Sequence, residues 1–152
     1  EFVLEPELNE LGEGAVWTNI IVPGNWEDQG FRDYDGFAWY RKTIVVPETY
    51  KGSSFVLLMG KIDDLDQVFI DGVKVASTGT MYENHGEILG KEWKALRGYY
   101  LPSNSIQLGK QHEISVRVYD SHGGGGIYEG PVGIITQQHY TEFWKNNRKQ
   151  ND

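Results

Sequence analysis

The residues best suited to chemistry are three aspartates in one short segment, Asp63, Asp64 and Asp66. Two neighbouring carboxylates can act as acid and base in hydrolysis, and clustered carboxylates are also the ligands that Ca²⁺ prefers. The loop spacing of an EF-hand is absent, however, and aspartates between two strands commonly cap backbone N–H groups in a turn. We therefore expect these aspartates to be structural, with a structural calcium site as the alternative, and no cofactor is required.

A run of four glycines occupies residues 123–126. A phosphate-binding loop needs Lys-Ser/Thr and a helix after its glycines, whereas this run is followed by Ile127-Tyr128-Glu129 and then by Pro131, which would stop a helix. A flexible linker is another interpretation of such a run. The surrounding aromatic and acidic residues favour instead a strand-to-loop exit at which the backbone comes close to other atoms.

Aromatic side chains in irregular segments are candidates for ligand binding. Sugars present flat C–H faces that stack on rings, and Asp, Asn, Glu or Arg side chains bind their hydroxyl groups. Five aromatic residues lie in segments rich in Gly, Asp, Asn and Glu, namely Trp26, Tyr34, Tyr82, Trp93 and Tyr128. A loop aromatic can equally cover the core, so both roles stay open for each of them.

Composition excludes several kinds of partner and site. A net charge of −8 without a basic stripe argues against nucleic acid. The absence of cysteine excludes disulfides and a catalytic thiol, and the 4 histidines are too scattered for a zinc site. No apolar run is long enough to span a bilayer, so we expect no membrane insertion in this segment. Because the sequence begins at Glu1 rather than at Met, we expect a processed or trimmed chain.

The elements that must position these residues are strands. Apolar and polar residues alternate over strand length, and helical spacing is hard to find. The predicted strands are residues 16–21, 38–46, 54–60, 67–70, 73–77, 97–101, 112–119 and 133–137, with a short helical turn within 103–109. Asp71-Gly72 predicts a two-residue hairpin turn, and alternation places Tyr40 in the core with Trp39 on the other face.

The length of the chain fits one domain. We predict a β-sandwich of two antiparallel sheets over residues 1–141. Residues 142–152 have little apolar content beyond two aromatics, and we expect them to be a linker remnant or a frayed tail.

Several motifs resemble one protein family. VPGNWE at 22–27, DGFAWYRK at 35–42, GKIDDLD at 60–66 and VRVYD at 116–120 resemble the sugar-binding domain of glycoside hydrolase family 2. GNWEDQG at 24–30, with the glycine run before Ile127-Tyr128, is also similar to the corresponding domain of bacterial sialate O-acetylesterases. Both resemblances imply a galactose-binding-like jelly-roll β-sandwich.

The resemblance also implies a function without catalysis by this chain. In both families the catalytic residues belong to a separate domain, and no Gly-x-Ser-x-Gly element occurs in this sequence. Asp120, Tyr128 and Glu129 match the positions at which the hydrolases bring an acidic loop near the sugar, although the glycine run replaces bulkier residues. We therefore add Asp120 and Glu129 to the candidate carbohydrate-binding residues.

The expected function is a non-catalytic carbohydrate-binding or scaffolding domain of a carbohydrate-active enzyme. Its expected partner is a glycan or a catalytic domain of the same polypeptide. From the resemblance alone, we expect a secreted, periplasmic or cell-surface location. Two alternatives stay open: a purely structural domain that packs against a catalytic domain, and the ligand-sensing ectodomain of a receptor.

Overall fold

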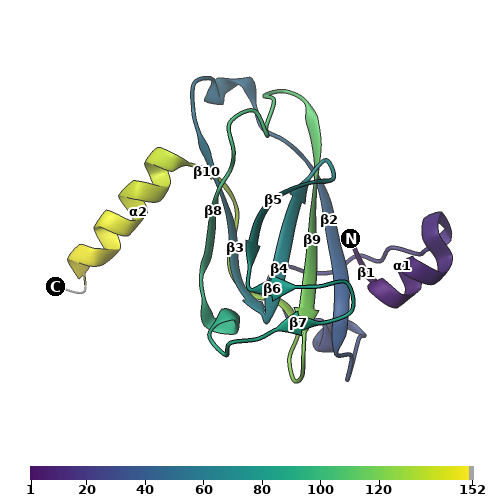
Figure 1. Cartoon of the computed structure of the whole chain (residues 1–152). Helices are drawn as coiled ribbons and strands as arrows, with labels where there is room; N and C mark the ends of the chain where they lie inside the picture. The colour runs from purple at the N-terminus through teal and green to yellow at the C-terminus, as the bar shows by residue number, and fades with distance from the viewer. Residues whose placement is uncertain (151–152) are drawn as a thin grey trace.

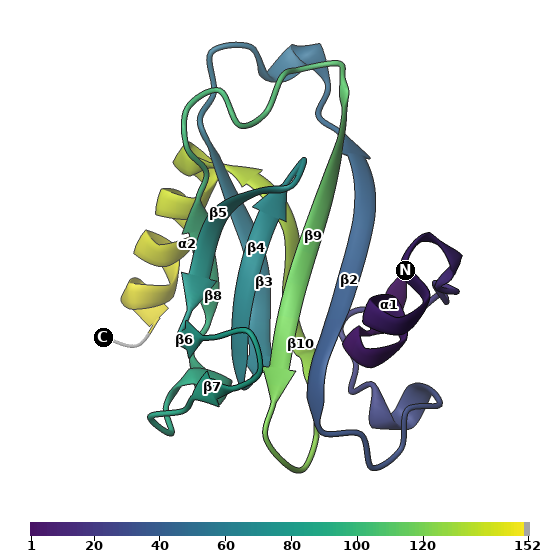
Figure 2. The same cartoon turned by 45° about the vertical axis from the view of Figure 1, so that its right-hand side comes forward.

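Two antiparallel sheets face one another in the computed structural model, which describes residues 1–150 (Figures 1 and 2). The five-stranded sheet has the order β1-β2-β9-β4-β5, and the three-stranded sheet has the order β10-β3-β8. A small hairpin, β6–β7, lies near one end of the sandwich. The prediction of an all-β sandwich is therefore confirmed.

The strands are β1 (Phe2–Leu4), β2 (Gly36–Val45), β3 (Phe55–Asp63), β4 (Leu65–Ile70), β5 (Val73–Thr78), β6 (Thr80–Met81), β7 (Gly86–Glu87), β8 (Arg97–Tyr100), β9 (Gln111–Asp120) and β10 (Gly126–Thr136). The helices are α1 (Glu5–Leu11) and α2 (Gln137–Gln150), with short 3₁₀ turns at Gly12–Gly14, Glu27–Gln29, Glu48–Tyr50 and Glu92–Lys94. Most predicted strands are confirmed. Alternation predicted them correctly, since the apolar residues of each strand face the space between the two sheets.

Apolar side chains from both sheets and from the 22–31 segment form one core. Ala38 and Tyr40 of β2 are buried within it, whereas Trp39 points to the other face and packs on Phe69. Within the core, the ring of Phe2 packs edge-on against Tyr40, with 4.9 Å between ring centroids. The predicted inward and outward faces of β2 are thus confirmed.

The predicted hairpin at Asp71-Gly72 is also confirmed. Both residues have positive φ, 49° and 80°, as a type I′ turn requires. The Asp71 carboxylate accepts hydrogen bonds from His112 Nδ1 at 2.6 Å and from the Glu113 backbone N–H at 2.8 Å. The turn is therefore fixed to the start of β9.

Two predicted elements are wrong. Residues 16–21 make only an isolated bridge, between Phe2 and Thr18, because the segment lies beside the short edge strand β1 and leaves Val16 and Ile21 exposed. Residues 103–109 form turns rather than a helical turn. The last strand, in contrast, is longer than predicted, because β10 starts at the final glycine of the run and pairs along β3.

The C-terminal segment differs from the expected frayed tail. Helix α2 crosses the predicted boundary at residue 141 and extends away from the sandwich (Figure 1). Its first turn is attached to β8, since the Tyr140 ring packs on Tyr100 and occupies space that a side chain at Gly98 would fill. Residues 151–152 of the predicted tail lie outside the described residues.

Candidate functional site

The glycine run is packed against the 24–27 segment. A side chain on Gly125 would overlap the Trp26 ring, and one on Gly126 would overlap the Tyr40 hydroxyl. Hydrogen bonds join the segments, because Trp26 N–H donates to the Gly125 carbonyl at 3.1 Å and Gly125 N–H donates to Glu27 Oε2 at 2.9 Å. The expected close approach is confirmed, and the flexible-linker interpretation is wrong.

The same packing removes Trp26 from the candidate binding residues. Its side chain is fully buried, and its Nε1 donates to the Tyr34 carbonyl at 3.2 Å. Tyr34 is half-buried against Trp26, and its hydroxyl donates to the Phe37 carbonyl at 2.6 Å. Burial raises the pKa of Tyr34 to about 12. The Trp26 ring has no face free for a ligand, and Tyr34 mainly supports the loop that covers the core.

Three carboxylates converge at the end of the sandwich where β3 turns into β4 and where β9 ends. One oxygen each of Asp63, Asp64 and Asp120 lies within 4.8 Å of the others. Asp64 N–H donates to the Tyr119 carbonyl at 2.8 Å, which joins the β3–β4 turn to β9. This group, called the aspartate cluster below, was only partly predicted, because Asp120 is distant in sequence.

Asp66 does not belong to the aspartate cluster. It is fully buried, accepts from Arg97 Nε at 2.9 Å and from the Tyr99 hydroxyl at 2.5 Å, and is therefore neutralised within the core. Alternation along β4 explains this position, since Asp66 is followed by inward-facing Val68 and Ile70. The predicted calcium ligand set that included Asp66 is wrong in this respect.

The aspartate cluster is electrostatically strained. Burial, together with the adjacent Asp64, raises the pKa of Asp63 to about 8. Burial and the charges of Asp63 and Asp64 raise the pKa of Asp120 to about 9. Oδ2 of Asp120 and Oε1 of Glu27 are buried without a hydrogen-bond partner in the described structure. The cluster therefore favours a proton or a cation.

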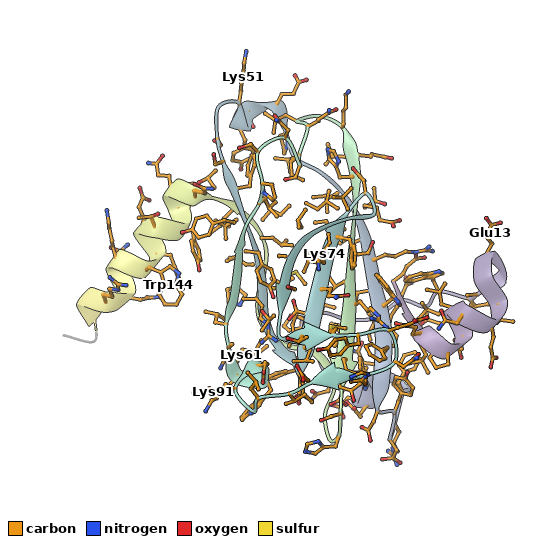
Figure 3. The ribbon with its side chains drawn as sticks, viewed as in Figure 1. Glu13, Lys51, Lys61, Lys74, Lys91 and Trp144 are labelled. Carbon is orange, nitrogen blue, oxygen red and sulfur yellow. The ribbon has the colours of Figure 1, made fainter. Side chains whose placement is uncertain are left out.

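Exposed aromatic residues lie at the same end of the sandwich as the cluster. Trp93 and Tyr82 are 46% and 45% exposed, and the Tyr128 hydroxyl donates to the Trp93 carbonyl at 2.5 Å. Glu129 is exposed and pairs with Lys61 Nζ at 2.5 Å. Figure 3 places Lys61 and Lys91 at this end, opposite Lys51, and shows Trp144 out on α2. Four of the predicted residues, Trp93, Asp120, Tyr128 and Glu129, thus belong to this end, and Tyr82 lies on the β6–β7 hairpin.

Two buried arginines that the sequence analysis missed position these loops. Arg97 donates to the carbonyl of Asp64 at 2.9 Å and to that of Ala95 at 2.7 Å. Arg117 donates to the Tyr82 carbonyl at 3.0 Å and binds both carboxylate oxygens of Glu5 at 2.7 Å. The signal available in the sequence was an arginine within each strand. The carboxylate partners of these arginines, however, are 31 residues away for Arg97 and 112 residues away for Arg117.

A separate apolar groove lies between the two sheets and is lined by residues of β2, β3, β9 and β10. It has a volume of about 830 Å³ and is lined by residues such as Ile20, Val22, Ile44, Met59, Val132 and Ile134. None of the predicted site residues lines it. The polar end and the apolar groove are therefore distinct surfaces.

Comparisons with known proteins identify the fold. No known family model matches the chain. A β-glucuronidase of Paenibacillus borealis is 35% identical over 51 residues, which are 34% of this chain and 9% of that protein. Among solved structures, a β-glucuronidase of Ruminococcus gnavus has a TM-score of 0.59 and 17% identity, over 78% of this chain and 20% of its own.

Two further solved structures agree. β-Glucuronidase 2 of Bacteroides uniformis has a TM-score of 0.58 and 19% identity, over 74% of this chain and 14% of its own. The β-glucuronidase of Dictyoglomus thermophilum has a TM-score of 0.54 and 19% identity, over 78% of this chain and 18% of its own. This chain therefore spans a fifth or less of the length of these relatives.

These findings define the chain as a β-sandwich domain with the fold of a part of β-glucuronidases. The predicted resemblance to the sugar-binding domain of glycoside hydrolase family 2 is confirmed at the level of the fold. The similarity to sialate O-acetylesterases stays a prediction. Within residues 1–150, neither helix combines the length and the apolar character needed to cross a membrane.

Proposed function

We propose that this chain is a non-catalytic domain of a carbohydrate-active enzyme, with its acidic and aromatic end turned toward a glycan. The proposal is supported mainly by one observation: Trp93 is 46% exposed, and its carbonyl accepts a hydrogen bond from Tyr128 at the same end of the sandwich as the aspartate cluster, in a fold that β-glucuronidases also contain. A half-exposed ring offers a flat apolar face to a sugar, and nearby carboxylates accept hydrogen bonds from its hydroxyl groups.

The geometry of the carboxylates supports a non-catalytic role. Glycoside hydrolysis uses two carboxyl groups that flank the scissile bond, about 5 Å or more apart, with room for sugar or water between them. In the aspartate cluster the oxygens lie within 4.8 Å of one another, and Asp120 is fully buried. Such a group suits the support of a loop better than the attack on a substrate.

A second candidate function is docking against another domain of the same polypeptide. It is favoured by the apolar surface of the 89–96 segment, on which Leu89 is 85% exposed and Leu96 is 41% exposed, next to Trp93. Contiguous exposed apolar residues commonly mark a contact with another protein surface. The same end of the sandwich then serves as a scaffold rather than as a sugar site.

A sugar titration separates the two functions. Neutral sugars, glucuronides and longer glycans are added to the ¹⁵N-labelled chain while amide shifts and tryptophan fluorescence are followed. We expect shifts in residues 82–93 and 128–129, loss of the response in Trp93→Ala, and an unchanged response in Trp144→Ala, whose ring lies on α2. Unchanged spectra over the whole panel would reject glycan binding and leave the docking function.

A further inference from the structure

We propose that Asp63, Asp64 and Asp120 bind a calcium ion that connects the two sheets at the acidic end of the sandwich. The inference goes beyond the proposed function, because such an ion stabilises the fold whether or not a glycan binds. It also changes the ligand set expected from the sequence, in which Asp66 took the place of Asp120.

The spacing of the oxygens suits calcium. Ca–O distances of about 2.3–2.6 Å place opposite ligands of one ion about 4.6–5.2 Å apart. One oxygen from each of the three aspartates lies within 4.8 Å of the others, so all three fit around a single ion of this size. Carboxylates are hard ligands, and the chain has no cysteine, so calcium is favoured over zinc or copper.

A second observation, independent of the clustering, also indicates a cation. Asp120 is fully buried, and its Oδ1 accepts one long hydrogen bond, from His122 N–H at 3.3 Å. Its Oδ2 has no hydrogen-bond partner in the described structure. Burial of an unpaired carboxylate oxygen is costly, and such groups normally have a hydrogen-bond, ionic or metal partner.

The described residues supply no ion-paired positive charge for this purpose. In the described part of the chain, no lysine, arginine or histidine forms an ion pair with an aspartate of the cluster. The nearby Arg97 is already bonded to Asp66 and to backbone carbonyls. Glu27, whose Oε2 accepts from Gly125 N–H, also has its Oε1 buried without a partner in the described structure.

The location gives the ion a structural role. Asp63 ends β3 of the three-stranded sheet, and Asp120 ends β9 of the five-stranded sheet. An ion shared by both strand ends therefore holds the β3–β4 turn and the start of the glycine run together. The loop from Ser121 onward is already attached to Asp64, whose Oδ2 accepts from the N–H and hydroxyl of Ser121 at 3.1 and 3.0 Å.

Calorimetric titration of the chelator-treated chain with CaCl₂ tests the proposal. We expect one site with a dissociation constant of about 1 mM or tighter, and a melting temperature that rises with calcium concentration. Asp120→Asn and Asp63→Asn should each raise the dissociation constant at least about tenfold, because each removes a charged ligand. Asp28→Asn, an exposed carboxylate next to Glu27, is the matched control and should bind as the original chain does.

Three results would overturn the proposal. One is no heat and no change in melting temperature up to about 10 mM CaCl₂, well above the weakest calcium sites of extracellular modules. Another is calcium binding that is unchanged in both Asp120→Asn and Asp63→Asn, with the folding of each variant verified by circular dichroism. The third is tighter binding of Mg²⁺ than of Ca²⁺. Each result is independent of the sugar titration.

Discussion

The guanidinium of Arg97 and the carboxylate of Asp66 form a fully buried ion pair, in which Nε donates to Oδ1 at 2.9 Å. The same guanidinium donates to the Asp64 and Ala95 carbonyls. One buried cation therefore positions both the turn that carries the aspartate cluster and the segment that carries Trp93. The candidate site is built on the core rather than on mobile loops.

Removal of this cation should destabilise the fold strongly. In Arg97→Met, Asp66 remains buried without its charged partner, and we expect the free energy of unfolding to fall by about 3–5 kcal/mol. Urea denaturation measures the change. Arg32→Met, at an exposed position, should change it by no more than about 0.5 kcal/mol. An Asp66→Asn/Arg97→Met double variant should recover part of the loss, and a stable Arg97→Met would contradict this view of the pair.

The glycine run should tolerate substitution at one position but not at the next. A Cβ at position 125 overlaps the Trp26 ring, so Gly125→Ala should lower the free energy of unfolding by about 1–3 kcal/mol. Gly124 is exposed, and a Cβ there meets only the Asn25 side chain, at 3.3 Å. Gly124→Ala is therefore the control, with an expected change within about 0.5 kcal/mol. If Gly125→Ala lowered the free energy of unfolding as little as Gly124→Ala, the run would be loosely packed against Trp26.

Without divalent cations, stability should decrease as the pH rises. The pKa is raised to about 8 for Asp63 and to about 9 for Asp120, whereas an aspartate in an unfolded chain titrates near 3.9. Between these values the folded state holds more protons than the unfolded state, so the free energy of unfolding declines with pH. The stabilisation is complete below about pH 4 and is lost as the pH passes through 8 and 9.

Denaturation in chelator at a series of pH values measures this decline. The negative charges of Asp64 and Glu27 hinder the ionisation of both aspartates, and that of Asp35 hinders the ionisation of Asp120. The positive charge of Arg97 favours the ionisation of Asp63. Asp120→Asn removes one of the titrating groups, so the difference in stability between variant and original chain should grow in favour of the variant from about pH 4 to about pH 9. A difference that is constant from pH 5 to pH 9 would contradict the raised pKa values.

Arg117 should hold the segment that carries Tyr82. In Arg117→Met, the Tyr82 carbonyl and the Glu5 carboxylate lose a charged donor, and we expect a loss of about 1.5–3 kcal/mol. Hydrogen exchange should become faster at Tyr82 and in α1. Arg41→Met removes a more exposed pair, with Glu1, and should cost at most about 1 kcal/mol. Unchanged exchange at Tyr82 would show that the hairpin is held by other contacts.

The sequence by itself determined most of the strands. Alternation placed Tyr40 inside β2 and Trp39 outside, and Asp71-Gly72 fixed the β4–β5 turn, because side-chain direction and turn conformation depend on neighbouring residues. Residues 16–21 also alternate, but a strand forms only where another strand is available for pairing. Here only Thr18 pairs, with Phe2, and the local sequence does not show whether a partner strand is present. The sequence did not predict helix α2, because the Tyr140 side chain in its first turn packs in the space beside Gly98, and that space exists only in the folded chain.

Only the tertiary structure decided which residues form the site. Trp26 and Trp93 both lie in irregular, polar segments, yet one is fully buried and the other is nearly half-exposed, because the glycine run covers the first. Asp66 lies outside the aspartate cluster and Asp120 within it, since Arg97 neutralises the first while β9 brings the second beside Asp63. Local sequence specifies strand faces and turns, whereas burial and the proximity of charges arise from contacts between residues far apart in the chain.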